Sequence, residues 1–133
     1  MHRTINGDVL VQHLAADTMT IDRELLAASG RSGRTLVKEG PLRLTLIGLA
    51  AGGTLPPHST ANPVSIHVLQ GAVVFSALQQ QYSLAAGDVL IFAAGVEHAA
   101  ESTSGASLLL TVAYTPKPGD AEHAAAAMTP GPA

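Results

Sequence analysis

The stretch LPPHSTANPVSIHVLQG, from Leu55 to Gly71, contains the features that decide the fold. Its two consecutive prolines, Pro56 and Pro57, predict a turn that presents His58. A polar loop follows, and residues 64–69 then form an apolar run with the β-branched content and the flanking turn residues of a strand. Gly71 is expected to end that strand. The stretch therefore predicts a turn that carries a histidine and leads directly into a β-strand.

Further strands are predicted on both sides of this stretch, because short runs of Val, Leu, Ile and Ala alternate with turn residues. In LRLTLIGLA, which begins at Leu42, leucines alternate with Arg43, Thr45 and Ile47, the period of a half-buried strand. The strands expected are residues 35–38, 42–50, 64–69, 72–78, 82–84, 89–92, 96–100 and 107–114. Since they recur about every 8 to 12 residues, the chain is expected to be all-β, an antiparallel sandwich or barrel.

Turns are expected at residues 31–33, 39–41 and 79–81, the last as a polar hairpin tip of three glutamines. Residues 89–92 are short and continuously apolar, so this strand is expected to be buried on both faces.

A chain of 133 residues is expected to form one domain. Residues 1–33 are expected to form an N-terminal segment with a short helix at residues 19–28, where apolar side chains recur at helical spacing. Residues 34–115 carry the strand pattern and should form the barrel. Residues 116–133 are rich in Pro, Gly and Ala and are interpreted as a tail, either a docked helix or disordered.

The composition excludes several classes of function. The chain has no cysteine, which excludes disulfides, zinc-thiolate sites and cysteine nucleophiles. The net charge is −3 with no cluster of Lys and Arg, so a nucleic-acid partner is not expected. No apolar run approaches the roughly 18 residues of a membrane span, and the first residues do not resemble a secretory leader. A protein without membrane contact, located in the cytoplasm, is expected.

Three of the six histidines, His58, His67 and His98, fall in the predicted strands or at their edges. Neutral imidazole is the commonest metal ligand, so histidines that converge inside a barrel are the first candidate site. A single histidine in a strand is more often a hydrogen-bonded structural residue, and that alternative stays open for each of the three.

The spacing of glycines and histidines resembles the two sequence motifs of the cupin superfamily. Gly53, His58 and Gly71 match the first motif, and the second motif is matched by Gly87, Gly95 and His98. The flanking strand pattern extends the resemblance from about residue 34 to residue 114. The resemblance implies a single antiparallel jelly-roll β-barrel of the cupin type, similar to the small single-domain bacterial cupins, and a homodimer.

The chain departs from the cupin motifs at positions that bear on function. Thr60 replaces the second histidine of the first motif, Val64 replaces its glutamate, and Ala93 replaces the proline of the second motif. Two of the four ligand positions therefore remain, and the resemblance implies a reduced metal site at His58 and His98. Catalytic metal sites normally have three protein ligands, so water or substrate would complete the coordination of Fe, Mn, Ni or Zn.

The ligand pocket is expected to contain Thr60, Val64, Ile66, His67 and Phe92. His67 is the least secure member, because side chains alternate along a strand and His67 falls on the face opposite Val64. Only a bulge would return it to the pocket. Packing of His67 at a sheet or subunit interface is the favoured interpretation.

Two functions are predicted. The first is a small-molecule-binding barrel with an apolar cavity and polar histidines at its mouth. The second is a metal-dependent enzyme, a dioxygenase or an isomerase of small metabolites.

Overall fold

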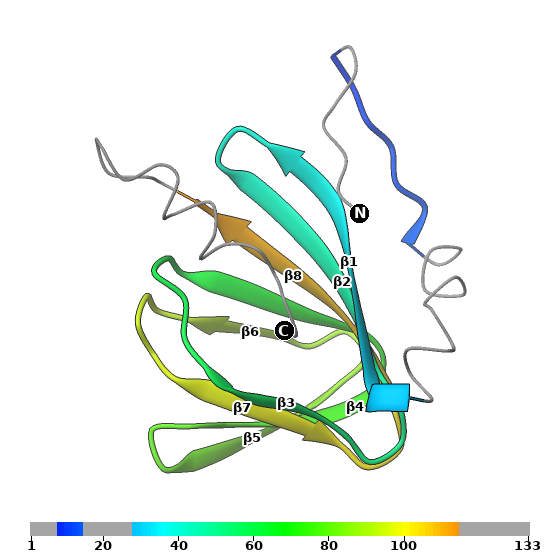
Figure 1. Cartoon of the computed structure of the whole chain (residues 1–133), viewed down its shortest axis with the longest axis vertical. Coiled ribbons are helices and arrows are strands. Elements are labelled where there is room, and N and C mark those ends of the chain that lie inside the picture. Colours follow the sequence, from blue (N-terminus) through cyan, green and yellow to red (C-terminus); the bar gives the residue numbers. More distant parts are fainter. Residues whose placement is uncertain (1–7, 15–27, 115–133) are drawn as a thin grey trace.

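The computed structural model describes residues 8–14 and 28–114, and the described part of the chain folds into eight β-strands (Figure 1). The strands are β1 (Arg31–Glu39), β2 (Leu42–Leu49), β3 (Gly53–His58), β4 (Val64–Ala77), β5 (Gln80–Ala85), β6 (Val89–Phe92), β7 (His98–Ser102) and β8 (Ala106–Ala113). All the strand pairs are antiparallel, so the prediction of an all-β antiparallel fold is confirmed. The helix expected at residues 19–28 lies, except for its last residue, outside the described residues, and so does the tail at 116–133.

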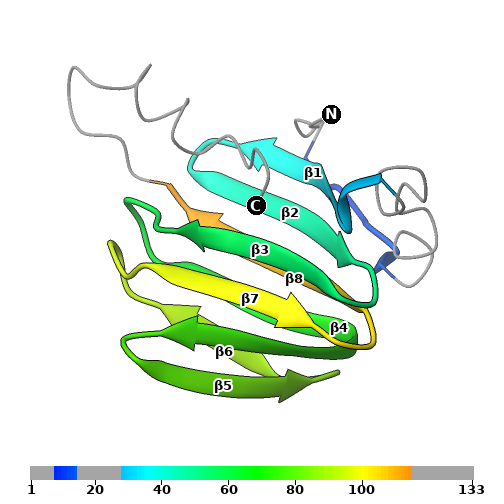
Figure 2. The ribbon, with the colours of Figure 1, turned by 60° about the horizontal axis from the view of Figure 1, so that its bottom comes forward.

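The strands form two sheets that share β4. Sheet A has the order β1-β2-β8-β4-β6, and sheet B has the order β3-β7-β4-β5. Figure 2 shows the two layers, with β3 and β7 in front of β8. Pairing of the described strands stops at β1, β3, β5 and β6, so the architecture is a half-barrel and not a closed ring of hydrogen bonds.

Strand β4 passes from one sheet to the other at Gly71. Residues 64–71 pair with β6 and β8, whereas residues 72–77 pair with β5 and β7. Gly71 has a φ of 77°, a conformation that residues with a Cβ rarely adopt, and a bulge lies just before it. The expectation that Gly71 ends the strand is therefore wrong, because the glycine bends the strand without interrupting it.

The core lies between the inner faces of the two sheets. Along β4 the buried residues Val64, Ile66 and Val68 alternate with half-buried ones, as the period-2 pattern predicts. Phe75 on the second half of β4 and Leu108 on β8 pack into the same cluster.

No helix among the described residues is long and apolar enough to cross a membrane.

The outer face of sheet A is also apolar. Leu36, Val37 and Leu46 form a second buried cluster there, and Leu10 and Leu14 from the segment 8–14 pack against it. Ile47 lies with Leu49 in the inner core, on the face of β2 opposite to Leu46.

The expectation that residues 89–92 are buried on both faces is wrong. Val89 is 53% exposed and Ile91 67% exposed, whereas Phe92 is buried. Strand β6 lies at an edge of sheet A, and its outward side chains are not covered by any part of the chain that the structure describes.

Three expected turns differ in the structure. Pro56 and Pro57 lie inside β3, where the register with β7 shifts, and β3 tolerates them because it is an edge strand. Strand β1 begins at Arg31, where a turn was expected. The tip of the β4–β5 hairpin is at Leu78 and Gln79, both with positive φ, while the next two glutamines belong to β5.

Candidate functional site

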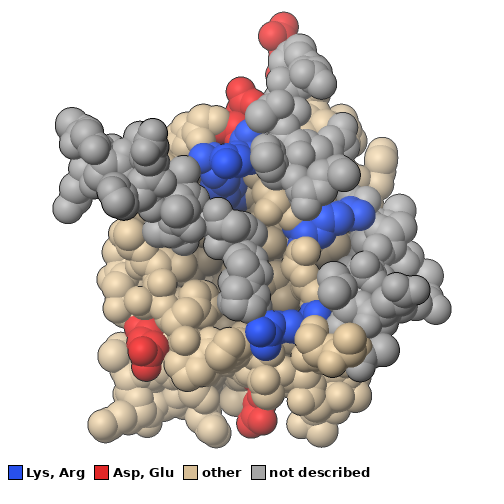
Figure 3. Space-filling view, in the orientation of Figure 1, with Lys and Arg blue, Asp and Glu red and all other residues tan. Residues whose placement is uncertain are grey.

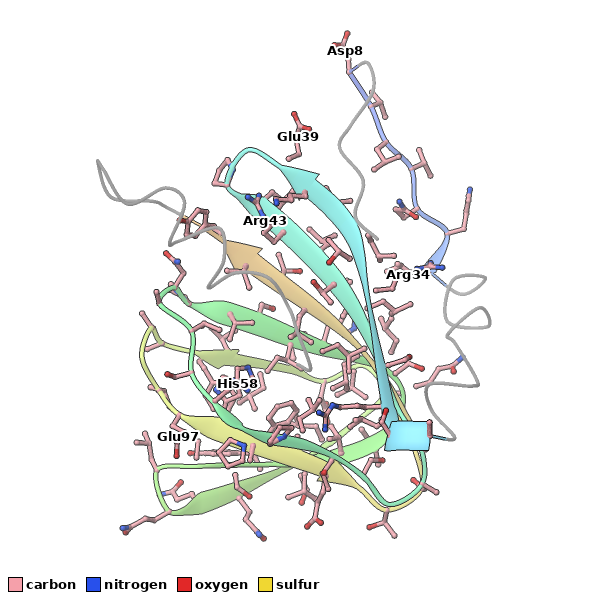
Figure 4. All side chains as sticks on the ribbon, viewed as in Figure 1. Asp8, Arg34, Glu39, Arg43, His58 and Glu97 are labelled. Carbon is pink, nitrogen blue, oxygen red and sulfur yellow. The ribbon has the colours of Figure 1, made fainter. Side chains whose placement is uncertain are left out.

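His58 and His98 lie side by side on the inner face of sheet B. Strand β3 ends at His58, strand β7 begins at His98, and the two residues are partners in the β3–β7 register. Their ring centroids are 4.6 Å apart, with an angle of 60° between the ring planes. Figure 4 shows the His58 side chain in the space between the two sheets. The structure thus brings together the two histidines that the sequence motifs single out.

Two phenylalanines complete a cluster of aromatic rings. Phe92, at the end of β6 in sheet A, stacks on His98 with a centroid distance of 4.3 Å and an interplanar angle of 7°. Phe75 lies 5.9 Å from Phe92 and 6.2 Å from His98. Because Phe92 belongs to sheet A and His98 to sheet B, this stack joins the two sheets at the histidines.

Each histidine ring is oriented by the backbone carbonyl two residues before it. His98 Nδ1 lies 3.0 Å from the Val96 carbonyl oxygen, and His58 Nδ1 lies 3.4 Å from that of Pro56. A carbonyl oxygen can only accept a hydrogen bond, so these contacts favour the tautomer with the proton on Nδ1, more strongly for His98 at 3.0 Å than for His58 at 3.4 Å. In this tautomer the lone pair of each ring is on Nε2.

The environment of His98 favours its neutral form. The residue is 4% exposed, and this burial is the main cause that lowers its pKa below the ordinary value of 6.5. The hydrogen bond to Val96 opposes this shift, and the nearby His58 adds to it. His58 is only half-buried, so the pair meets solvent through His58.

Thr60 holds together the two loops next to the histidines. Its hydroxyl donates a hydrogen bond of 2.6 Å to the Asn62 carbonyl, and its own carbonyl accepts one of 2.8 Å from the Gly95 amide. One of these loops follows His58 and the other precedes His98. Thr60 therefore has a clear structural role as the bridge between them.

The remaining predicted pocket residues divide between the two faces of sheet A. Val64, Ile66 and Phe92 are buried in the inner core. His67 is paired in register with Leu109 and Val89, which lie on the outer face, so His67 does not share a face with His58 and His98. The only shift in register of β4 with β8 comes after Val68, too late to turn His67 inward.

The described residues do not form a complete metal centre. Within residues 8–14 and 28–114, no group of three or more His, Asp or Glu side chains could hold a metal ion. Glu97 is adjacent to His98 in sequence, but it is exposed and points away from His58 (Figure 4). Two imidazoles fall short of the three protein ligands that a catalytic transition metal normally has.

Charged side chains are sparse around the site. On the face seen in Figure 3, the Lys and Arg side chains lie in separate groups, and the uppermost group borders acidic side chains. Arg43 is on the inner face of sheet A, in a cross-strand row that runs through Val112 and Val64 to Phe92. Three strand spacings, about 14 Å, separate the backbones at the two ends of this row. The Arg43 guanidinium donates hydrogen bonds to the carbonyls of Gly40 and Leu42, at the β1–β2 turn.

A separate hollow of about 290 Å³ lies on the outer face of sheet B. Its lining includes Pro56, Pro57, Ser76, Ala99 and Glu101, and the alternation along β7 places Ala99 and Glu101 opposite to His98. This hollow is not part of the histidine site.

The sequence did not identify Phe75 or the two carbonyls that orient the histidines. The sequence did contain a signal for Phe75, because this residue lies in the apolar run 72–78 that was predicted to be a strand. The carbonyl contacts depend on loop conformation and have no sequence signal.

Comparison with known proteins supports the motif assignment. Residues 45–114 match the family model described as "Cupin domain". A comparison with curated protein sequences gave no match.

Solved structures share the fold at low sequence identity. A conserved protein of unknown function from Streptococcus pyogenes superposes with a TM-score of 0.68 at 23% identity, covering 86% of this chain and 97% of that one. A cupin superfamily protein from Desulfitobacterium hafniense gives a TM-score of 0.61 at 20% identity, covering 64% and 78%. A salicylate 1,2-dioxygenase from Pseudoaminobacter salicylatoxidans gives 0.68 at 16% identity, covering 77% of this chain and 34% of the enzyme. The family match spans more than half of the chain, and the protein belongs to the cupin family.

Proposed function

We propose that this cupin binds a small molecule at the His58–His98 pair. The observation that carries the proposal is the orientation of the two rings. Both have Nδ1 directed to a backbone carbonyl, and among the described residues no hydrogen bond reaches either Nε2. A ring nitrogen that makes no hydrogen bond to these residues is available to a donor on a ligand, and this supports binding at the pair.

A library screen by NMR or thermal shift tests this function. Compounds that bind the wild-type chain are expected to lose binding in His58→Ala. His67→Ala is the matched control, since His67 is also a half-buried histidine but lies on the outer face of sheet A. Binding that survives His58→Ala, or that is lost equally in His67→Ala, contradicts the proposal.

The second candidate is a metal-dependent enzyme, a dioxygenase or an isomerase. Orientation of a histidine by a carbonyl on its other ring nitrogen is typical of metal ligands, and this favours the candidate. His58 and His98 would hold Fe, Mn, Ni or Zn, which would supply Lewis acidity toward a bound substrate. One of the neighbouring folds is a salicylate 1,2-dioxygenase, but its identity to this chain is only 16%. The absence of a third ligand among the described residues ranks this candidate second.

Elemental analysis separates the two candidates. Protein purified without chelator or affinity metal is measured before and after incubation with Fe, Mn, Ni and Zn. Near-stoichiometric metal that disappears in His58→Ala supports the enzyme, and oxygen-dependent turnover becomes the next assay. Metal-free protein after all four incubations supports the binding barrel.

We also propose a homodimer formed through the outer face of sheet A. The exposed Val89 and Ile91 lie there, and the outward residues of β4, β6 and β8 include no Asp, Glu, Lys or Arg. An uncharged apolar face is self-compatible with an identical copy. Analytical ultracentrifugation of the wild type and of Ile91→Glu tests this: the wild type is expected to sediment as a dimer and the variant as a monomer.

A further inference from the structure

We propose that the His58–His98 pair recognises a neutral hydroxyl group on a mainly apolar molecule, of which phenol is the simplest, and not a carboxylate. This inference rests on the proposed binding function and adds the chemical class of the ligand.

The first step is the hydrogen-bonding character of the pair. The contacts with the carbonyls of Pro56 and Val96 favour the tautomer with the proton on Nδ1 in each ring. Each Nε2 therefore offers a lone pair and no proton, so the pair presents two acceptors. An acceptor needs a donor, and a neutral carbonyl, ether or carboxylate group on a ligand cannot supply one.

The second step concerns charge. A carboxylate would require a cation beside the pair, and the inner-face cation in the same row, Arg43, is three strands from Phe92 and donates to the carbonyls of the β1–β2 turn. An ammonium ligand would require a carboxylate, and the neighbouring Glu97 is exposed and directed away. A donor without charge matches these surroundings best, and a hydroxyl is such a donor.

The third step concerns the rest of the ligand. The side chains next to the pair are apolar and buried: the rings of Phe92 and Phe75 and the aliphatic inner face of β4. Burial of apolar ligand surface against them is favourable, and aromatic rings pack well beside an existing stack. His58 is the more exposed histidine, so a ligand approaches from its side.

Three probes of similar size separate the alternatives: phenol has a neutral donor, toluene has the same shape without a donor, and benzoate is an anion. Each is titrated into the full-length chain at pH 7.5 and followed by NMR, with the metal content of the same sample measured. Phenol is expected to bind about tenfold or more tightly than toluene and benzoate, because a buried hydrogen bond separates them. The largest shifts are expected at the His58 and His98 imidazoles.

Variants then assign the preference to the rings. His98→Phe keeps an aromatic ring against Phe92 but removes the acceptor, so the affinity for phenol is expected to fall to that for toluene in the same variant. His67→Ala is expected to leave all three affinities as they are. If His98→Phe does not fold, His58→Phe provides the same comparison at the more exposed ring.

Several outcomes would overturn the assignment. They are benzoate or toluene binding as tightly as phenol in the wild type, phenol binding that is unaffected by loss of either imidazole, and failure of all three probes to bind. The library screen decides the binding function separately. Screen hits that depend on His58 while phenol does not bind would reject the ligand class and leave the binding function standing.

Discussion

The two ends of the half-barrel connect its sheets in different ways. At the glycine end, formed by Gly30, Gly53, Gly71 and Gly105, main chains touch: a Cβ on Gly53 would lie 2.2 Å from the Gly30 oxygen, and one on Gly71 would lie 2.1 Å from the Gly105 oxygen. At the histidine end, formed by His58, His98 and Phe92, the contact is between side-chain rings. At the glycine end the touching main chains leave no space for a residue with a Cβ. At the histidine end one aromatic ring can be replaced by another. The fold is therefore expected to depend on the glycine end, and ligand chemistry to depend on the histidine end.

The largest expected effect is that of Gly71→Ala. The new Cβ would overlap the Gly105 carbonyl at a positive φ, so the backbone at the corner between the sheets has to move. We expect a loss of about 3 kcal/mol or more in the free energy of unfolding, measured with urea. Gly40→Ala is the matched control, because Gly40 also has a positive φ but no atom lies near its Cβ position; its cost should be about 1 kcal/mol. Equal losses in the two variants would contradict the close-contact argument.

A smaller effect at the same end is expected for Ser102→Ala. Ser102 is 1% exposed, and its hydroxyl donates to the Ala72 carbonyl and accepts from the Gly105 amide. Removing the hydroxyl leaves two polar backbone groups without this partner, which should cost about 2 kcal/mol by chemical denaturation. Ser104→Ala, at an exposed position two residues away, should be close to neutral. Equal stability of the two variants would show that the hydroxyl does not support the glycine end.

The smallest effect is expected at the histidine end, where His98→Phe loses one hydrogen bond, to the Val96 carbonyl, and should cost about 1 kcal/mol at pH 7.5. Its clearer signature is pH dependence. Burial lowers the pKa of His98 below 6.5, so the unfolded chain takes up a proton first as the pH falls. The stability of the wild type should therefore decrease below about pH 6.5 and level off once the pH passes the folded pKa. One proton limits the slope to about 1.4 kcal/mol per pH unit.

The variant should lack this component, so denaturation curves from pH 7.5 to pH 5 should diverge in its favour. Parallel curves would mean that His98 is not desolvated in the folded chain. A large loss of stability in His98→Phe at pH 7.5 would break the contrast between the two ends.

The sequence predicted well what depends on local period. Alternation in β4 correctly indicated that Val64, Ile66 and Val68 share the inner face. The continuous apolar run at residues 89–92 was misjudged, because such a run does not show which of its faces other strands cover, and Val89 is exposed. Pro56 and Pro57 were predicted to form a turn, but they lie inside β3. A strand tolerates prolines where it lies at the edge of a sheet, and the order of strands in a sheet cannot be predicted from the local residues.

At the site, motif spacing identified His58 and His98, and the structure adds the ring contacts of the pair and the carbonyls that favour one tautomer. The tautomers depend on carbonyls two residues upstream, whose direction is set by loop backbone. The assignment of these residues to metal or to a ligand stays a prediction.

Strand β4 has a consequence for how the molecule comes apart. It is hydrogen-bonded to β6 and β8 in one sheet and to β5 and β7 in the other, with the bend at Gly71 in between. Neither sheet can lose β4 while the other keeps it intact, so the two layers should behave as one cooperative unit in native-state hydrogen exchange. The amides of both halves of β4 should exchange last and at a common rate, while those of the edge strands β3 and β6 open earlier.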